Sequence, residues 1–198
     1  MEPSQSLPAS YFDALYQTDI DPWKFATSEY EAEKYGTTIA ALPNAHYRSA
    51  LEIGGSIGVL TQKLAPYCDS LLSIDVSQLA QNEAIQRCQQ LAQVRFQIMN
   101  FPQQFPDELF DLILVSEVGY YWSREDLKIA QQRILQLLEI GGQLLLVHWL
   151  PRSPNYPLTG DEVHESFLNF MPQQLQHVKG MNNAQYRLDL FQCLGKAN

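Results

Sequence analysis

The sequence predicts an α/β fold with a seven-stranded, mostly parallel sheet. Short apolar runs of strand length alternate with longer segments whose apolar residues recur at helical spacing, which is typical of parallel sheets with right-handed crossovers. One run ends in a glycine-rich turn, Gly54-Gly55-Ser56-Ile57-Gly58, and the last two runs are joined by the turn-like Met181-Asn182-Asn183. Runs joined by so short a turn pair as an antiparallel hairpin. The chain is therefore expected to close with one.

The length of 198 residues suits one well-buried domain over residues 1–198. Three parts are expected within it. Residues 11–43 are helical in tone and rich in aromatic side chains, residues 47–150 hold the main alternation of strands and helices, and residues 151–198 end in the hairpin.

Each strand and helix has a local signal in the sequence. The centre of the fourth strand, Leu112-Ile113-Leu114-Val115, is apolar throughout, as expected of a strand covered on both faces. Strands are expected at Ala50–Ile53, Leu71–Ile74, Val94–Met99, Phe110–Ser116, Leu144–Val147, Leu175–Gly180 and Tyr186–Cys193. Helices are expected from Gly58 to before Pro66, from the N-cap Ser77 to about Leu91, from the N-cap Ser123 to Gly141-Gly142, and from Thr159 or Asp161 to about Phe170.

Composition restricts the class of protein. The formal net charge of −9, without a local cluster of Lys or Arg, opposes nucleic acid as a partner and favours a small neutral or cationic molecule. No apolar stretch is long enough for a membrane span, and the first residues lack the features of a secretory signal. Cys68, Cys88 and Cys193 are far apart, which indicates buried reduced thiols. We expect a cytoplasmic protein.

Two acids follow neighbouring apolar runs at the places where a cofactor cleft forms in such sheets. Glu52 stands just before the glycine turn, and Asp75 ends the second strand. Glycines let the backbone pass close to a ligand, and an acid at the end of the second strand can accept hydrogen bonds from ribose hydroxyls. A cofactor that contains a nucleoside is the first hypothesis.

The spacing of the glycines distinguishes between such cofactors. The dinucleotide fingerprint that starts at Gly54 requires glycine at positions 56 and 59, where the chain has Ser56 and Val59. The pattern is instead acid-x-Gly-x-x-x-Gly, which suits a cofactor with a zwitterionic amino-acid tail. This describes S-adenosylmethionine, with S-adenosylhomocysteine as its product. A tight strand-to-helix turn without a ligand is the alternative.

Further motifs resemble those of a known family. They are Asp21-Pro22-Trp23-Lys24-Phe25-Ala26-Thr27-Ser28-Glu29-Tyr30-Glu31 with Lys34-Tyr35, Leu51-Glu52-Ile53-Gly54, Ile74-Asp75-Val76, and Phe110-Asp111-Leu112-Ile113 running into Glu117-Val118-Gly119-Tyr120-Tyr121. Over residues 11–193 the chain resembles class I S-adenosylmethionine-dependent methyltransferases, and among them the NodS-like enzymes, named for a nodulation N-methyltransferase. One departure is Ser56, where many class I enzymes have a third glycine.

The resemblance implies a three-layer Rossmann-like class I methyltransferase fold with an N-terminal helical lid over residues 11–43. It also implies an activity, the transfer of a methyl group to a small polar acceptor. The accepting atom is expected to be an amine nitrogen, such as that of an amino sugar. Residues 47–150 then form the cofactor-binding core. Residues 150–172, with three prolines, are where acceptor selection is expected.

Cofactor contacts are expected at the ends of the strands and in the aromatic entry segment. Asp75 is expected to accept from the ribose, Glu52 to attract the ammonium group directly or through water, and Asn100 to meet the adenine edge. The full set is Trp23, Tyr30, Tyr35, Glu52, Gly54, Ser56, Gly58, Asp75, Val76, Asn100, Phe101 and Ser116. For Asp75 the alternative is a helix cap, and for Phe101 it is plain core.

The aromatic entry segment carries two interpretations. Trp23 and Tyr30 are seven residues apart and share one face if the segment is a single helix. Aromatic faces attract a sulfonium or an ammonium, so the segment can serve as a lid. The alternative is a helix that packs its aromatic face on the edge of the sheet.

Candidates for orienting the acceptor, or for taking its proton, follow strands four and five. They are Glu117, Tyr120, Tyr121 and His148. The pKa of an unperturbed histidine suits proton transfer near neutrality, although His148 can equally be a hydrogen-bonded wall residue. His164 stands in an acidic segment that matches no zinc signature, and no metal is expected.

Three other functions stay open at this stage. One is O-methylation of a small metabolite, although the carboxylate set of a magnesium-dependent enzyme is not evident. Another is a nicotinamide-dependent oxidoreductase, which the missing third glycine and the missing Tyr-x-x-x-Lys pair disfavour. The third is a non-catalytic nucleoside-binding protein of the same fold.

Overall fold

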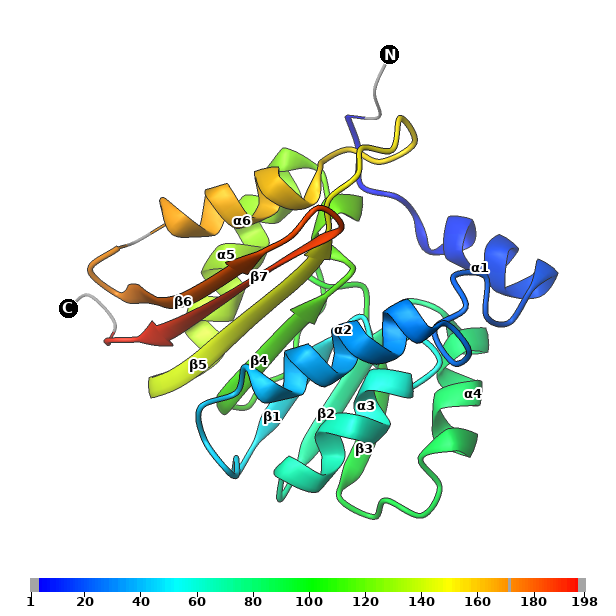
Figure 1. The fold of residues 1–198 in the computed structure, drawn as a ribbon, viewed down its shortest axis with the longest axis horizontal. Coiled ribbons are helices and arrows are strands. Elements are labelled where there is room, and N and C mark those ends of the chain that lie inside the picture. Colours follow the sequence, from blue (N-terminus) through cyan, green and yellow to red (C-terminus); the bar gives the residue numbers. More distant parts are fainter. Residues whose placement is uncertain (1–3, 171, 196–198) are drawn as a thin grey trace. The chain divides into compact units, whose positions relative to one another are not determined.

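The computed structural model describes residues 4–170 and 172–195, which form two compact units: residues 8–100, and residues 101–195 together with residues 4–7. Residues 1–3, 171 and 196–198 of the predicted domain lie outside the described residues. The predicted α/β fold, with a seven-stranded, mostly parallel sheet and a C-terminal antiparallel hairpin, is confirmed (Figure 1).

In the unit of residues 8–100, three parallel strands lie side by side in the order β3-β2-β1. They are β1 (Ala50–Ile53), β2 (Leu71–Asp75) and β3 (Val94–Ile98), connected through α3 (Val59–Leu64), the short η1 (Ala65–Tyr67) and α4 (Gln78–Arg87). The Ser77 side chain caps α4 as predicted, and α4 packs against β2 and β3. This helix ends at Arg87, earlier than the predicted Leu91.

The segment before β1 forms two helices, α1 (Ala9–Thr18) and α2 (Glu29–Ala40). Between them, the Asp21 carboxylate accepts from the backbone N–H groups of Phe25 and Ala26 at 2.7 and 3.0 Å, which closes a turn. Trp23 lies in this connection and Tyr30 lies on α2. The idea that both share a face of one continuous helix is therefore wrong.

In the unit of residues 101–195, the strand order is β4-β5-β7-β6. Strands β4 (Phe110–Ser116) and β5 (Leu138–Trp149) are parallel, whereas β7 (Tyr186–Cys193) runs antiparallel to both β5 and β6 (Leu175–Asn182). The centre of β4, residues 112–115, is at most 1% exposed, as its sequence predicts.

Strand β5 is longer than predicted, because the pair Gly141-Gly142 lies inside it and does not close the preceding helix. Helix α5 (Arg124–Leu137), capped by Ser123 as predicted, passes directly into the strand. The pairing with β4 shifts between Phe110 and Leu112, and Gly141 takes a left-handed φ of 82°. Glycine in that conformation is typical of a bulge, so the glycines break the register of the strand without ending it.

Two further elements complete this unit. The short η2 (Gly119–Tyr121) follows β4, and α6 (Gly160–Leu168) packs against η2, β5 and β7. Thr159 caps α6 through a capping box with Glu162, so of the two predicted start points Thr159 is the N-cap.

The structure also bears on the cysteines, on membrane-spanning helices and on metal-binding groups. Cys68, Cys88 and Cys193 are all buried, as predicted. Within the described ranges, no helix has both the length and the apolar character needed to cross a membrane. Among the same residues, no group of three or more His, Cys, Asp or Glu side chains is placed to hold a metal ion.

The capping box of α6 gives a first test. Thr159→Ala removes the hydroxyl that accepts from the Glu162 N–H, so we expect the free energy of unfolding to fall by about 1 kcal/mol. Urea titration followed by circular dichroism measures this. Thr159→Ser keeps the hydroxyl and serves as the control. Equal losses in both variants would mean that the cap is not the cause.

Candidate functional site

The turn between β1 and α3 contains three residues in the left-handed region. Gly54, Ser56 and Gly58 have φ values of 85°, 49° and 79°. At Gly58 an added Cβ would lie 2.9 Å from the Cα of Ala84, so only glycine fits both the backbone conformation and the space. The turn keeps this shape through contacts with side chains of the neighbouring loop.

Asp75, at the end of β2, holds the turn through its carboxylate. One oxygen accepts the Ser56 N–H at 2.8 Å and the other accepts the Ser77 N–H at 2.8 Å. Burial raises the pKa of Asp75, and these N–H groups oppose that rise. A carboxylate has about four lone-pair sites, so the oxygens retain capacity to accept from further donors.

Glu52 lies beneath the turn and is 1% exposed. One carboxylate oxygen accepts from the hydroxyls of Thr61 at 2.5 Å and Ser73 at 2.8 Å. Burial raises the pKa of Glu52 to about 7, against the effect of these hydrogen bonds. Gly55 leaves the room for this arrangement, because an added Cβ would lie 2.0 Å from the Ser73 hydroxyl oxygen.

Helix α1 supplies two side chains that the sequence analysis missed. The Tyr16 hydroxyl lies 2.6 Å from the Ser56 hydroxyl, and Ser77 donates to the Asp13 carboxylate at 2.7 Å. Both contacts reach the loops that Asp75 joins. Tyr16 falls on the apolar face of α1 with Phe12, so helical spacing alone marks it as a core residue.

A row of aromatic rings runs from Tyr16 through the rest of the predicted lid. Trp23 lies edge-on to Tyr16 at 5.7 Å and stacks on Phe25 at 5.4 Å, and Phe25 lies 6.5 Å from Tyr35. Because Tyr16 contacts Ser56, this row connects Trp23 and Tyr35 with the glycine turn.

The other predicted cofactor residues are more scattered. Tyr30 is half-buried on α2, Val76 is half-buried next to Asp75, and Asn100 is exposed after β3. Phe101 belongs to the other unit and is 6% exposed. The structure therefore brings the turn and Asp75 into direct contact. For Asn100 and Phe101 it shows the position in the chain and the burial.

In the unit of residues 101–195, the loop after β4 is held by β5. Ser116 is 6% exposed, and Glu117 has a left-handed φ of 57°. The Glu117 N–H donates to the Val147 carbonyl at 2.9 Å. Its carboxylate accepts from the Tyr120 hydroxyl at 2.6 Å and from the Trp149 N–H at 3.0 Å. A non-glycine residue in this conformation needs such support.

The tyrosines after Glu117 form a cluster with Tyr156 from the predicted acceptor region. Tyr156 stacks on Tyr120 at 5.3 Å and meets Tyr121 edge-on at 4.8 Å. Burial, followed by the nearby Glu117 carboxylate, raises the pKa of Tyr120 well above its usual range. Burial also raises the pKa of Tyr121. Both hydroxyls therefore stay protonated and can orient a group but not take its proton.

His148 is fully buried at the carboxyl end of β5. Its Nε2 accepts the Gly119 N–H at 3.0 Å, and its Nδ1 lies 3.1 Å from Nε2 of the equally buried His164. Both ring nitrogens are thus hydrogen-bonded within the protein, which suits a positioning residue better than a base that meets substrate.

One protein-family model, described as nodulation protein S (NodS), matches residues 14–152, more than half of the chain. The chain belongs to the NodS family. A nodulation protein S of Rhizobium tropici is 32% identical over 127 residues, which cover 63% of this chain and 53% of the relative. With this relative and two others, the alignment spans about half of the relative's length.

Solved structures share the fold of this NodS-family chain. The N-methyltransferase NodS of Bradyrhizobium japonicum WM9, crystallised with S-adenosylhomocysteine, matches with a TM-score of 0.83 and 24% identity, over 93% of this chain and 97% of that one. A crystal structure described as a putative methyltransferase from Pseudomonas syringae matches with a TM-score of 0.74 and 32% identity, over 83% and 99%. The predicted class I methyltransferase fold is confirmed.

The buried Glu52 gives a second prediction. Its pKa in the folded chain, about 7, lies above the ordinary 4.5, so its stabilising effect is complete below about pH 4.5 and is lost as the pH rises through about 7. The shift corresponds to about 3 kcal/mol. Glu52→Gln cannot ionise, so we expect its Tm to rise relative to that of the unmodified chain between pH 5 and 8.

Thermal unfolding at several pH values measures this difference. Glu33→Gln, which changes an exposed carboxylate on α2, is the control and should show no such divergence. A constant Tm difference between the Glu52 variant and the unmodified chain would contradict the raised pKa.

Proposed function

We propose that this chain is an S-adenosylmethionine-dependent methyltransferase that methylates the amine nitrogen of a small polar acceptor, such as an amino sugar. The observation that carries the proposal is the Asp75 carboxylate, fixed by two backbone N–H groups against a left-handed glycine turn. Membership of the NodS family supports it. So does the NodS structure described as an N-methyltransferase in complex with S-adenosylhomocysteine.

The residues of the turn fit such a cofactor. The remaining lone pairs of Asp75 would accept from the two ribose hydroxyls, and the narrow backbone at Gly54, Ser56 and Gly58 would admit the amino-acid tail. Glu52, buried beneath the turn, would act on the ammonium group through water. We extend the proposal to the other predicted contacts, namely Trp23, Tyr30, Tyr35, Val76, Asn100, Phe101 and Ser116.

When bound, this cofactor supplies an electrophilic methyl group on a sulfonium. An amine must be neutral to accept it, so the nitrogen arrives deprotonated or loses a proton near the transition state. Glu117 is the group we propose to orient the amine and to receive that proton, because its carboxylate is fixed by Tyr120 and Trp149. Tyr120 and Tyr121 would orient the acceptor as neutral hydroxyls. Positioning of this kind can supply much of the rate enhancement.

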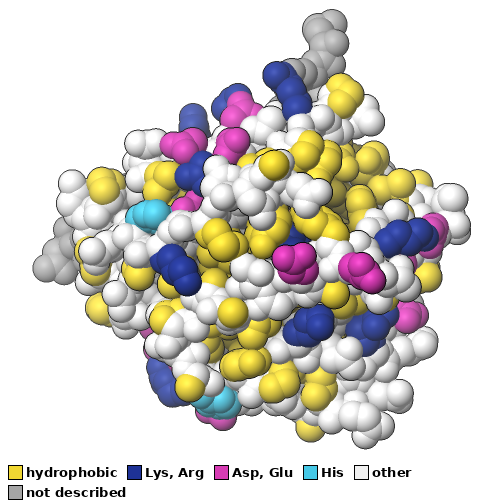
Figure 2. All heavy atoms as spheres, in the orientation of Figure 1, with side chains coloured by type: hydrophobic (Ala, Val, Ile, Leu, Met, Phe, Trp, Pro, Cys, Tyr) yellow, Lys and Arg dark blue, Asp and Glu magenta, His cyan; other side chains and the backbone are white. Residues whose placement is uncertain are grey.

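A small acceptor suits the charge and the surface of the molecule. The net charge of −9 opposes binding to a polyanion. On the face drawn in Figure 2, Lys and Arg side chains are scattered among acidic and apolar ones. Tyr156, from the predicted acceptor region, already stacks on Tyr120. We place the enzyme in the cytoplasm, where its three buried thiols stay reduced.

The role of Asp75 can be tested without knowing the acceptor. Asp75→Asn makes the hydrogen bonds to the ribose neutral and sets an NH2 donor in place of an oxygen that accepts the Ser56 or the Ser77 N–H, so we expect the affinity for S-adenosylhomocysteine to fall roughly 10- to 100-fold. Isothermal titration calorimetry measures it, with NAD as the competing candidate. Asp69→Asn, an exposed acid that precedes β2, is the control. Unchanged affinity in the Asp75 variant, or binding of NAD instead, would refute the proposed cofactor site.

The acceptor class is tested with labelled cofactor and two pools of compounds. The first pool contains amino sugars and other amines, and the second contains the matching sugars and alcohols without the amine. We expect transfer to the amine pool. Glu117→Gln should lower that transfer by a factor on the order of 100 or more. Glu125→Gln, an exposed acid on α5, should leave it unchanged. Transfer to hydroxyl compounds alone would overturn the preference for nitrogen.

A further inference from the structure

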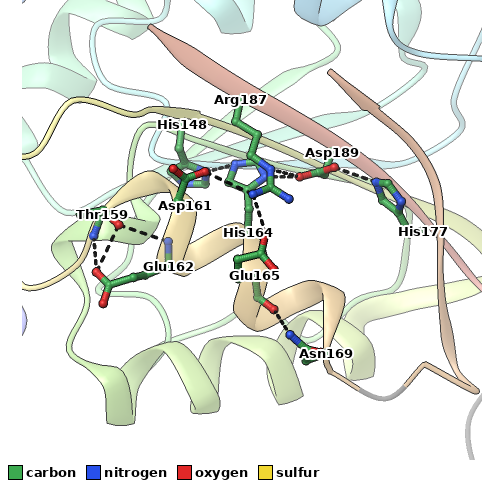
Figure 3. A network of polar contacts seen from close by, with 10 residues as sticks. All are labelled: His148, Thr159, Asp161, Glu162, His164, Glu165, Asn169, His177, Arg187 and Asp189. Atoms are coloured by element: carbon green, nitrogen blue, oxygen red, sulfur yellow. Dashed lines mark hydrogen bonds and ion pairs between the residues drawn. The ribbon is translucent and has the colours of Figure 1, made fainter. Parts of the chain in front are cut away.

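A row of buried polar side chains crosses three elements of the unit of residues 101–195 (Figure 3). His148 comes from β5, His164 from α6 and Asp189 from β7, and none is more than 2% exposed. Buried polar groups are tolerated when they are hydrogen-bonded, so a row of three indicates a specific arrangement. The sequence marks His148 and His164 as separate candidates, and no motif marks Asp189.

The Gly119 N–H determines where each proton lies. An amide N–H only donates, so His148 Nε2, 3.0 Å away, carries no proton. The proton of a neutral His148 is then on Nδ1, which donates to His164 Nε2 at 3.1 Å. By the same reasoning His164 carries its proton on Nδ1 and donates it to Asp189 Oδ2 at 2.6 Å. Every link has one donor and one acceptor.

Asp189 closes the row as an ionised acceptor. Arg187 Nε donates to its Oδ2 at 2.7 Å, and His177 Nε2 lies 2.7 Å from its Oδ1. Burial alone would raise the pKa of Asp189, but the hydrogen bond from His164 and the charge of Arg187 lower it. Arg187 also reaches the carboxylates of Asp161 and Glu165, as Figure 3 shows, so charges of both signs meet here.

We propose that His148, His164 and Asp189 form a one-directional hydrogen-bond chain that positions the Gly119 N–H and, with it, the loop that carries Glu117 and Tyr120. This inference rests on the proposed function for what the loop does, since Glu117 is the group assigned to the amine. The three side chains act by positioning, with both histidines neutral and protonated on Nδ1.

The chain is not a path for protons. It ends at a backbone amide, which does not give up its proton under ordinary conditions. A proton added at His148 Nε2 would face the Gly119 N–H, so two donors would meet at 3.0 Å. Burial lowers the pKa of His164, and the charge of Arg187 lowers it further. The carboxylates of Asp189 and Asp161 raise this pKa but do not cancel the effect of burial. His164 therefore stays neutral as well.

The loop depends on this contact because it is packed without slack. An added Cβ at Gly119 would lie 2.7 Å from Val163 Cγ1 on α6 and 2.8 Å from His148 Nε2. The last three residues of β5 each hold the loop. The Val147 carbonyl accepts the Glu117 N–H, the His148 ring accepts the Gly119 N–H, and the Trp149 N–H donates to the Glu117 carboxylate. Loss of the middle contact would release the loop between the other two.

Imidazole ¹⁵N NMR of the full chain, recorded without cofactor or acceptor, tests the tautomers. We expect His148 and His164 to be neutral with the proton on Nδ1 between about pH 7 and about pH 8. His46, whose side chain is 49% exposed, serves as the reference for a histidine in contact with water. A proton on Nε2 of either buried histidine, or protonation of His148 in this range, would overturn the proposal.

Two variants of His148 separate positioning from proton transfer. The side-chain oxygen of Gln reaches the position of Nε2 and can accept from Gly119, whereas Asn is too short. We expect hydrogen exchange of the Gly119 amide to quicken about tenfold or more in His148→Asn, and to stay near the original rate in His148→Gln. Equal exchange rates in the two variants would overturn the proposal. His46→Asn is the matched control.

Methyl transfer to an amine, once such an acceptor is found, adds a second measurement. Positioning predicts that His148→Asn lowers kcat about tenfold with little change in KM, and that His148→Gln restores it with the same pH profile. Equal loss in both variants, with the acidic limb of the profile gone, would mean that His148 transfers protons, and would overturn the proposal. Failure to find any amine acceptor would count against the proposed function and leave the NMR result as it stands.

Discussion

The contact between the Asp75 carboxylate and the backbone of the glycine turn is the constraint on which the proposed cofactor site depends. Ser56 is a non-glycine residue in a left-handed conformation, which costs on the order of 1 kcal/mol or more unless its surroundings hold it. The hydrogen bond from its N–H to Asp75 supplies that hold. The same carboxylate accepts the Ser77 N–H at the start of α4, so one side chain sets the shape of two loops. The proposed ribose-binding role would therefore add to a structural one and would not compete with it.

Much of this arrangement could be read from the sequence, because it follows from short-range rules. Apolar runs, glycines and capping residues are local signals, and they placed β1, β4, the N-caps Ser77 and Ser123, and the acid at the end of β2. The carboxyl ends of parallel strands in one unit lie along one edge, so residue order alone brings Asp75 next to the glycine turn.

The features that sequence reasoning missed depend on partners distant in the chain or on the choice between two local signals. Tyr16 meets Ser56 across 40 residues, and His164 meets Asp189 across 25. No periodicity reports such pairs. At Gly141-Gly142 the glycines fit a helix end and a strand bulge equally well, and only the pairing of β5 with β4 decides between them. The Asp21 carboxylate accepts from two backbone N–H groups and closes a turn between α1 and α2. The spacing of the aromatic residues gives no sign of this turn.

The groups around each titratable side chain, and not its residue type alone, determine its pKa and whether it can accept a proton. Glu52 and Asp189 are both buried carboxylates, yet the first accepts from the hydroxyls of Thr61 and Ser73 and has a raised pKa, while the second faces His164 and Arg187 and has a lowered one. The same comparison separates the two candidates for proton transfer. An unperturbed histidine has a pKa that suits a base near neutral pH. In His148, however, the nitrogen that would have to accept the proton already accepts the Gly119 N–H. The Glu117 carboxylate accepts hydrogen bonds from Tyr120 and Trp149 and keeps capacity to accept from a further donor, which is why we propose it as the group that orients the amine.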